Sequence, residues 1–94
     1  MIEVIGIIGA GQMGNGIAHV ASVAGYSVQL LDMDQERLDA ALATIDKNMA
    51  RQVRRTLLSD KDKAAALGRI QTSLDYASFG DCDIVIEAAA ENES

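Results

Sequence analysis

A glycine turn between an apolar run and a helical pattern constrains the fold of this chain more than any other feature. The turn contains Gly9, Gly11 and Gly14; the apolar segment 2–8 precedes it, and Asp32 ends the next apolar run. Gly9 permits a sharp turn out of a strand, Gly11 lets the backbone approach a pyrophosphate, and Gly14 allows close helix packing. The pyrophosphate then lies at the positive end of the helix. The sequence therefore predicts a dinucleotide-binding domain.

The rest of the pattern predicts an α/β fold, a Rossmann-type parallel sheet in the strand order 3-2-1-4. Continuous apolar residues over 4–8 are typical of a parallel strand that is buried on both faces. The periodicities predict strands at 4–8, 27–31, 70–72 and 83–88, and helices at 12–24, 35–57, 61–67 and 74–79. The helices at 35–57 and 61–67 would form a long hairpin after the second strand. We expect residues 1–94 to be the N-terminal part of one nucleotide-binding domain, truncated after its fourth strand.

Composition argues against several classes of function. No apolar run approaches the roughly 18 residues that a membrane span requires, so we expect no membrane partner. The net charge of −6 disfavours general nucleic-acid binding. Cys82 is the single cysteine and no secretory leader is visible, which together favour a cytoplasmic location. We assign no metal site.

The basic residues are concentrated in one part of the chain, because all eight of them lie within 37–69. Lys47, Arg51, Arg54 and Arg55 recur at i, i+4, i+7 and i+8 and so share one face of the second predicted helix. This stripe indicates either an ordinary solvated face or a local site for an anion.

Several of these motifs together resemble the start of the L-3-hydroxyacyl-CoA dehydrogenase family. The resemblance lies in Ile-Ile-Gly-Ala-Gly-Gln-Met-Gly-Asn-Gly-Ile-Ala at 7–18, Leu31-Asp32, the long helical insertion, and the segments 70–75 and 82–88. It covers the whole chain. It is specific because a glycine turn with this continuation is joined to a helical hairpin that most dinucleotide-binding folds lack.

The resemblance implies NAD as the cofactor and an acyl-CoA substrate. The implied cofactor-binding residues are Gly9, Gly11, Gln12, Met13, Gly14, Asp32, Ala88 and Glu91, of which the last two line the nicotinamide side. The implied contacts with the coenzyme A moiety are Asn48, Arg51 and Arg55. Asp32 would accept hydrogen bonds from the adenosine ribose, and its charge would repel a 2′-phosphate, which favours NAD over NADP.

The family's catalytic histidine, its glutamate partner and the assisting serine and asparagine would all follow Ser94, so we assign no catalytic residue. His19 shares the polar side of the first predicted helix with Gln12, Asn15 and Ser22, and we expect it to be a surface residue. Cys82 has no second cysteine or basic neighbour and is expected to be an inert small side chain.

The expected function is thus the NAD-binding part of an oxidoreductase of fatty acid metabolism that interconverts 3-hydroxyacyl-CoA and 3-oxoacyl-CoA. We expect the 94-residue chain to be inactive alone and to form homo-oligomers. One alternative is a β-hydroxyacid dehydrogenase of the 6-phosphogluconate type, which commonly has an arginine near Asp32 for NADP and lacks the long hairpin. Another is a non-catalytic nucleotide-binding or interaction module.

Overall fold

Four parallel strands form the sheet of this protein, for which a computed structural model describes residues 2–75, 79, 80 and 82–88. The strands are β1 (Val4–Ile8), β2 (Ser27–Leu31), β3 (Ile70–Ser73) and β4 (Ile84–Glu87). Their order is β3-β2-β1-β4, and all neighbouring strands are parallel, as the sequence predicted. The carboxyl ends of β1 and β2 therefore meet at one edge of the sheet.

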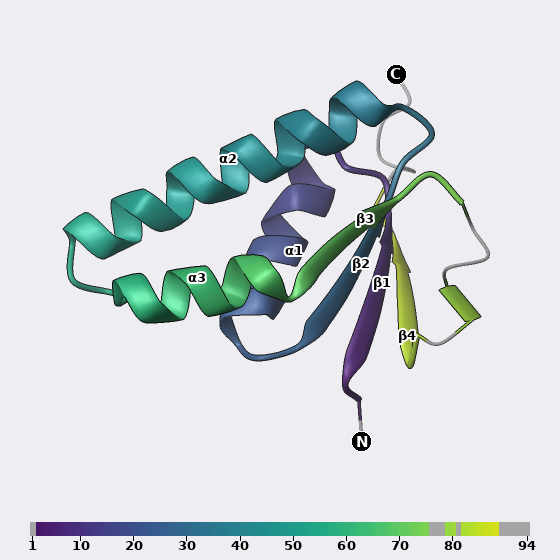
Figure 1. The fold of residues 1–94 in the computed structure, drawn as a ribbon. Helices are drawn as coiled ribbons and strands as arrows, with labels where there is room; N and C mark the ends of the chain where they lie inside the picture. Colours follow the sequence, from purple (N-terminus) through teal and green to yellow (C-terminus); the bar gives the residue numbers. More distant parts are fainter. Residues whose placement is uncertain (1, 76–78, 81, 89–94) are drawn as a thin grey trace.

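Three helices cover one face of this sheet (Figure 1). They are α1 (Gln12–Val23), α2 (Gln35–Arg54) and α3 (Asp60–Gly68). α1 connects β1 to β2, whereas α2 and α3 together connect β2 to β3. This is the arrangement that right-handed crossovers between parallel strands produce.

The hydrophobic core lies between the sheet and these helices. Ile7 pairs with Leu30 in the register of β1 and β2, and both side chains are fully buried. From the other side, α2 contributes residues at helical spacing, of which Ile45 and Met49 are fully buried. The apolar stripe of α2 is thus the surface that fixes the hairpin to the rest of the domain.

α1 packs closely on the sheet through small residues. Gly14, Ala18 and Ala21 are buried, and a Cβ atom on Gly14 would overlap the carbonyl oxygen of Gly9. Larger apolar residues of the helix are less buried, since Ile17 is only partly buried against the core and Val20 is 69% exposed. The predicted role of Gly14 in close helix packing is therefore confirmed by this contact.

The hairpin turns earlier than the sequence indicated. α2 ends at Arg54, so the prediction of a helix to residue 57 was wrong by three residues. Thr56 adopts a positive φ of 57°, which breaks the helix, and Leu57 is left 70% exposed. The hydroxyl of Ser59 then accepts a hydrogen bond from the N–H of Asp62 and caps α3.

The polar side of α1 is partly covered from His19 onward, which corrects the expectation that His19 is a surface residue. Its Nε2 lies 2.9 Å from Oε1 of Gln52 on α2, and the imidazole is half-buried. Ser22 is fully buried, and its carbonyl oxygen accepts a hydrogen bond of 2.6 Å from the guanidinium of Arg69. The hairpin covers this side of α1 and makes polar contacts with it.

Between β3 and β4, the described residues 79 and 80 lie on the side of the sheet away from the helices (Figure 1). A helix was predicted over 74–79; Leu74 is not helical, and residues 76–78 lie outside the described residues. Phe79 and Cys82 lie over Gly6, because a Cβ atom there would be 3.4 Å and 2.8 Å from them. Within the described part of the chain, no helix is both long and apolar enough to cross a membrane.

Candidate dinucleotide-binding site

The glycine turn opens the positive end of α1 toward the edge of the sheet. Gly9 has a φ of 103°, which favours glycine, and its N–H donates to the carbonyl oxygen of Leu31 over 2.7 Å. Gly11 is the N-cap, so no side chain caps α1, and its first turn contains no acidic residue. A Cβ atom on Gly11 would have no neighbour within 4 Å. An anionic group can therefore approach the free N–H groups of α1.

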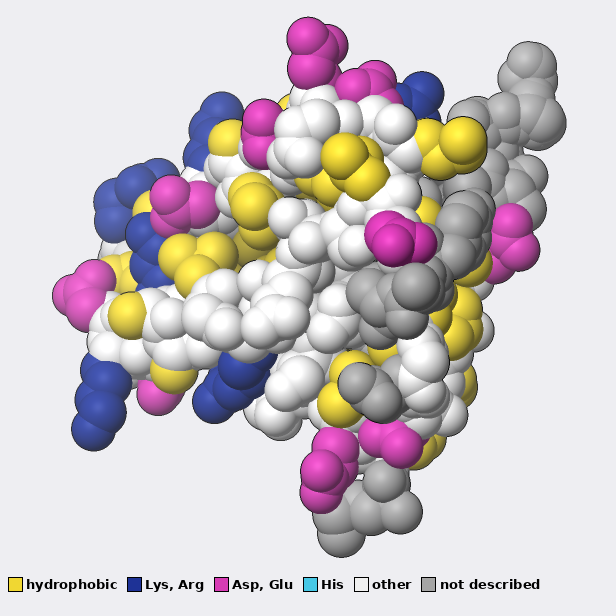
Figure 2. Space-filling view, turned by 45° about the vertical axis from the view of Figure 1, so that its right-hand side comes forward, with side chains coloured by type: hydrophobic (Ala, Val, Ile, Leu, Met, Phe, Trp, Pro, Cys, Tyr) yellow, Lys and Arg dark blue, Asp and Glu magenta, His cyan; other side chains and the backbone are white. Residues whose placement is uncertain are grey.

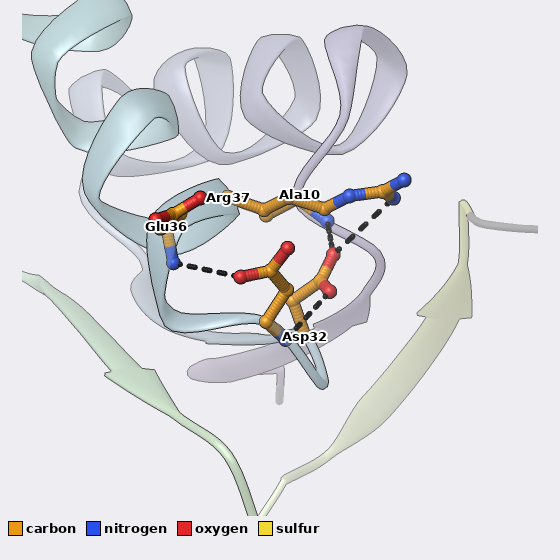
Figure 3. Close-up of polar contacts among 5 residues, drawn as sticks. Ala10, Asp32, Glu36 and Arg37 are labelled. Atoms are coloured by element: carbon orange, nitrogen blue, oxygen red, sulfur yellow. Dashed lines mark hydrogen bonds and ion pairs between the residues drawn. The ribbon is translucent and has the colours of Figure 1, made fainter.

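Asp32 joins this turn to the loop after β2. The residue is only 8% exposed, and its two carboxylate oxygens accept different backbone N–H groups. Oδ2 accepts from Ala10 over 2.9 Å, and Oδ1 accepts from Asp34 over 3.1 Å (Figure 3). Each carboxylate oxygen keeps further acceptor capacity. Asp32 is thus placed beside the glycine turn, where it can also accept hydrogen bonds from a ribose.

Arg37 is a site residue that the sequence analysis did not identify. Its Nη1 lies 4.0 Å from Oδ2 of Asp32 (Figure 3), and its side chain is 59% exposed. Asp34 caps α2, so Arg37 lies in the first turn of that helix, close to the carboxyl end of β2. The sequence could have indicated Arg37 through its position, because it lies five residues after Asp32 and three residues after Asp34, a typical N-cap residue.

Two hollows meet at Arg37. The first has a volume of about 360 Å³ and is lined by Ile8, Gly9, Leu31, Asp32, Met33, Asp34 and Arg37. The second has a volume of about 460 Å³ and is lined by Ala10, Gly11, Gln12, Asn15, Arg37, Ala40, Ala41 and Thr44. The first hollow lies beyond the carboxyl ends of β1 and β2, where parallel sheets bind nucleotides.

The remaining predicted cofactor residues lie at the start of α1 and after β4. Gln12 and Met13 are exposed at the start of α1, next to the turn. Ala88 is buried beyond β4, and its N–H donates to the carbonyl oxygen of Ile8 over 2.8 Å. Glu91 lies outside the described residues. The structure therefore brings Ala88 to the same edge of the sheet as the glycine turn.

The predicted coenzyme A residues lie in the distal half of α2, away from this edge. Arg51 and Arg55 are exposed and Asn48 is half-buried. α2 has 20 residues, which corresponds to roughly 30 Å. Figure 2 shows Lys and Arg side chains gathered over the hairpin, at the left of that view. The structure separates this basic surface from Asp32.

Among the described residues, no three His, Cys, Asp or Glu side chains lie together in a group that could hold a metal ion. Part of the positive charge of the hairpin is also neutralised within the chain. Nζ of Lys63 lies 2.7 Å from Oδ1 of Asp46, which joins α3 to α2. On the hairpin, the exposed guanidinium groups of Arg51 and Arg55 are therefore candidates for binding an external anion.

Known proteins share both the sequence and the fold. Residues 4–94 match the family described as 3-hydroxyacyl-CoA dehydrogenase, NAD binding domain. The chain is 48% identical over 93 residues to the 3-hydroxybutyryl-CoA dehydrogenase of Bradyrhizobium diazoefficiens, covering 99% of this chain and 32% of that relative. It is 37% identical over 86 residues to the fatty acid oxidation complex subunit alpha of Psychrobacter sp., covering 92% and 12%.

The structural likeness is equally extensive. The crystal structure of (S)-3-hydroxybutyryl-CoA dehydrogenase from Ralstonia eutropha matches with a TM-score of 0.94 at 41% identity, covering 99% of this chain and 33% of that one. The chain thus spans about a third of the length of these two dehydrogenases. The predicted resemblance, the Rossmann-type fold and the hairpin after the second strand are confirmed.

Proposed function

Since the chain belongs to the 3-hydroxyacyl-CoA dehydrogenase family, we propose that it forms the NAD-binding part of an enzyme that interconverts 3-hydroxyacyl-CoA and 3-oxoacyl-CoA. NAD would accept or donate the hydride. The observation that supports this most strongly is the bond between the Ala10 N–H and Asp32, which places a carboxylate beside the open end of α1. The match to this family disfavours the alternative of a 6-phosphogluconate-type enzyme.

The adenosine and pyrophosphate parts of NAD have separate candidate partners. The N–H groups of Gln12 and Met13 are at the start of α1, where aligned peptide dipoles favour a pyrophosphate. Gly9 and Gly11 keep side chains away from this position. Asp32 would accept hydrogen bonds from the ribose hydroxyls, for which its oxygens retain lone pairs.

The nicotinamide would lie on the β4 side of the turn. Ala88 supports this proposal, because it is buried beside Ile8 at the carboxyl end of the neighbouring strand. A small residue there leaves room for a ring. The family resemblance adds Glu91 to this side of the site.

Asn48, Arg51 and Arg55 would bind the coenzyme A moiety. The support for this proposal is the exposure of the two guanidinium groups and their distance from the NAD site along α2. Guanidinium groups form paired hydrogen bonds with phosphates, which the distal part of coenzyme A carries. The acyl-thioester end would then extend toward the nicotinamide.

The 94-residue chain should bind NAD but show no turnover by itself. Its only histidine, His19, contacts Gln52 beneath the hairpin and is not placed to take a proton from a substrate. NAD-dependent turnover that disappears in His19→Ala would contradict this. NAD binding without turnover even in the longer enzyme would instead favour a non-catalytic module.

The proposal extends to the cellular context. A single cysteine, Cys82, suits the reducing cytoplasm. We further propose, from the family resemblance alone, that the enzyme is a homo-oligomer.

Gly11→Val gives a direct test of NAD binding. The new side chain would project into space with no protein atom within 4 Å of its Cβ, so the fold should persist while the pyrophosphate is excluded. We expect isothermal titration calorimetry to show a Kd for NAD raised by about tenfold or more. Gly16→Ala is the matched control, because its Cβ also meets no neighbour but lies further along α1. Equal affinities of wild type and Gly11→Val would refute the proposed site.

A further inference from the structure

Arg37 is the cationic side chain that lies beside the carboxylate proposed to bind the ribose. Its Nη1 is 4.0 Å from Oδ2 of Asp32, which is an ion-pair distance but too long for a hydrogen bond. More than half of its side chain is exposed. The guanidinium is therefore held loosely and retains donors for another acceptor.

The other charges around the first hollow are negative. Asp32 and Asp34 line it, and Glu36 follows in the first turn of α2. The carboxylate of Asp34 accepts the N–H of Glu36 over 3.0 Å, and Asp32 accepts two backbone N–H groups (Figure 3). The carboxylates of Asp32 and Asp34 are fixed by backbone contacts, whereas the side chain of Arg37 is 59% exposed and can move toward a ligand.

We propose that Arg37 weakens the discrimination of this site against a 2′-phosphate. The inference rests on the proposed NAD-binding function. Asp32 would repel a phosphate on the ribose 2′-hydroxyl, and this favours NAD. Arg37 lies close enough to the same carboxylate to offset part of that repulsion and to donate to the phosphate. The site thus prefers NAD, but by a smaller margin than its acids alone would produce.

Position explains why Arg37 acts on the phosphate rather than on NAD itself. It lines the hollow that contains Asp32, and its guanidinium lies on the Oδ2 side of that carboxylate. A ribose hydroxyl can donate to the carboxylate, whereas it offers an arginine only an uncharged acceptor oxygen. A 2′-phosphate presents acceptor oxygens, which the arginine binds and the carboxylate repels. Removing Arg37 should therefore affect the phosphorylated nucleotide selectively.

The test compares two ligands that differ in a single phosphate, ADP-ribose and 2′-phospho-ADP-ribose. Their Kd values are measured by titration of the backbone amide resonances in wild type, Arg37→Met, Arg37→Lys and the control Lys61→Met, which removes an exposed cation from α3. Arg37→Met should raise the Kd for 2′-phospho-ADP-ribose by about tenfold and change that for ADP-ribose by less than about twofold. Arg37→Lys should recover part of the loss, and Lys61→Met should resemble wild type.

The outcomes separate this inference from the proposed function. If neither ligand shifts the amides of Ala10 and Gln12 in the wild type, the proposed NAD site itself is wrong. If ADP-ribose binds but Arg37→Met leaves the ratio of the two Kd values unchanged, only the assignment of Arg37 is overturned. An equal loss for both ligands would also overturn it, because Arg37 would then contribute to binding without reading the phosphate.

Discussion

Asp32 combines a structural contact with the proposed recognition of ribose. Its carboxylate accepts the N–H of Ala10 in the glycine turn and that of Asp34 in the following loop. A charged acceptor in a nearly buried position forms stronger hydrogen bonds than a neutral group. The geometry of the turn and the preference for a nucleotide therefore depend on the same side chain.

Substitution of Asp32 should change the choice of cofactor. In the full-length enzyme, Asp32→Ala removes both the ribose acceptor and the charge that repels a 2′-phosphate. We expect the ratio of kcat/KM for NAD to that for NADP to fall by about tenfold or more. Asp39→Ala on exposed α2 surface is the control. An unchanged ratio would mean that Asp32 serves the turn alone and does not contact the ribose.

At the scale of elements, the hairpin of α2 and α3 carries a basic surface at the end of α2 that is distant from the nucleotide site. Arg55 follows α2 as its C-cap and is exposed at the far end of the helix. Arg55→Ala in the full-length enzyme should raise the KM for acyl-CoA by about fivefold, because one exposed charge pair with a phosphate is lost.

The control for Arg55→Ala is a second substrate that lacks the phosphates. A short pantetheine thioester lacks the distal phosphates of coenzyme A, so its KM should remain close to the wild-type value. Steady-state kinetics with both substrates distinguishes phosphate binding from general damage. Equal increases in the two KM values would show that Arg55 belongs to an ordinary solvated face.

β4 is joined to the start of the chain by one carboxylate. Oδ2 of Asp83 accepts the N–H groups of Glu3 and Val4, over 2.8 Å and 2.9 Å. These backbone hydrogen bonds lower the pKa of Asp83 below its ordinary value near 3.8. A depressed pKa in the folded state means that the ionised carboxylate contributes stability above the unfolded pKa. That contribution is lost as the pH falls through the lower, folded value.

Acid unfolding should therefore depend on Asp83. Between the two pKa values the unfolded state binds more protons, so stability decreases as the pH falls through this window. Asp83→Asn should unfold at lower denaturant concentration than the wild type at pH 7 and lose less further stability as the pH falls below about 4. Glu87→Gln, at the other end of β4, is the control. If acid unfolding of Asp83→Asn parallels that of the wild type, these hydrogen bonds do not contribute to stability.

The positions of the helices and strands could be predicted from the sequence more completely than the faces that they bury. The period of apolar residues located the strands and helices, because burial imposes that period. It did not show that Val20, which lies at helical spacing with the other apolar residues of α1, stays exposed. Nor did it show that the hairpin covers His19, since a polar helix face is buried only where another element supplies partners such as Gln52.

Over the whole molecule, the sheet has one exposed edge that is strongly apolar. β4 is the last strand in the order, and Ile84 and Val85 are 41% and 44% exposed. An apolar edge strand with unpaired backbone groups favours pairing with another chain. We expect the isolated 94-residue chain to self-associate through β4, most simply about a two-fold axis.

Light scattering over a concentration series checks this expectation. The apparent mass should rise above the 10.0 kDa of a monomer as the concentration increases. Val85→Lys should shift the chain toward the monomer, because a charge on an edge strand opposes pairing. A strictly monomeric species at high concentration, unaffected by that substitution, would exclude self-association at this edge.

The site was predictable to the extent that backbone geometry demands particular residues. Gly9 has a φ of 103°, which favours glycine, and Gly14 lies against the carbonyl oxygen of Gly9, where a Cβ atom would not fit. The roles of these two residues could therefore be predicted from the sequence. The role of Arg37 could not, because its approach to Asp32 depends on how α2 begins. A surface charge leaves no comparable trace in a sequence, and the assignments of Arg51 and Arg55 rest on family resemblance.

The central claim is that NAD binds at the glycine turn and Asp32. A crystal structure of the chain in complex with NAD tests this claim most directly. We predict pyrophosphate oxygens within hydrogen-bond distance of the N–H groups of Gln12 and Met13, with the adenosine ribose hydroxyls on the carboxylate of Asp32. The fold around Gly9 and Ala10 should change little, because Asp32 already holds the turn. A nucleotide bound elsewhere, or one whose ribose does not contact Asp32, would contradict the account.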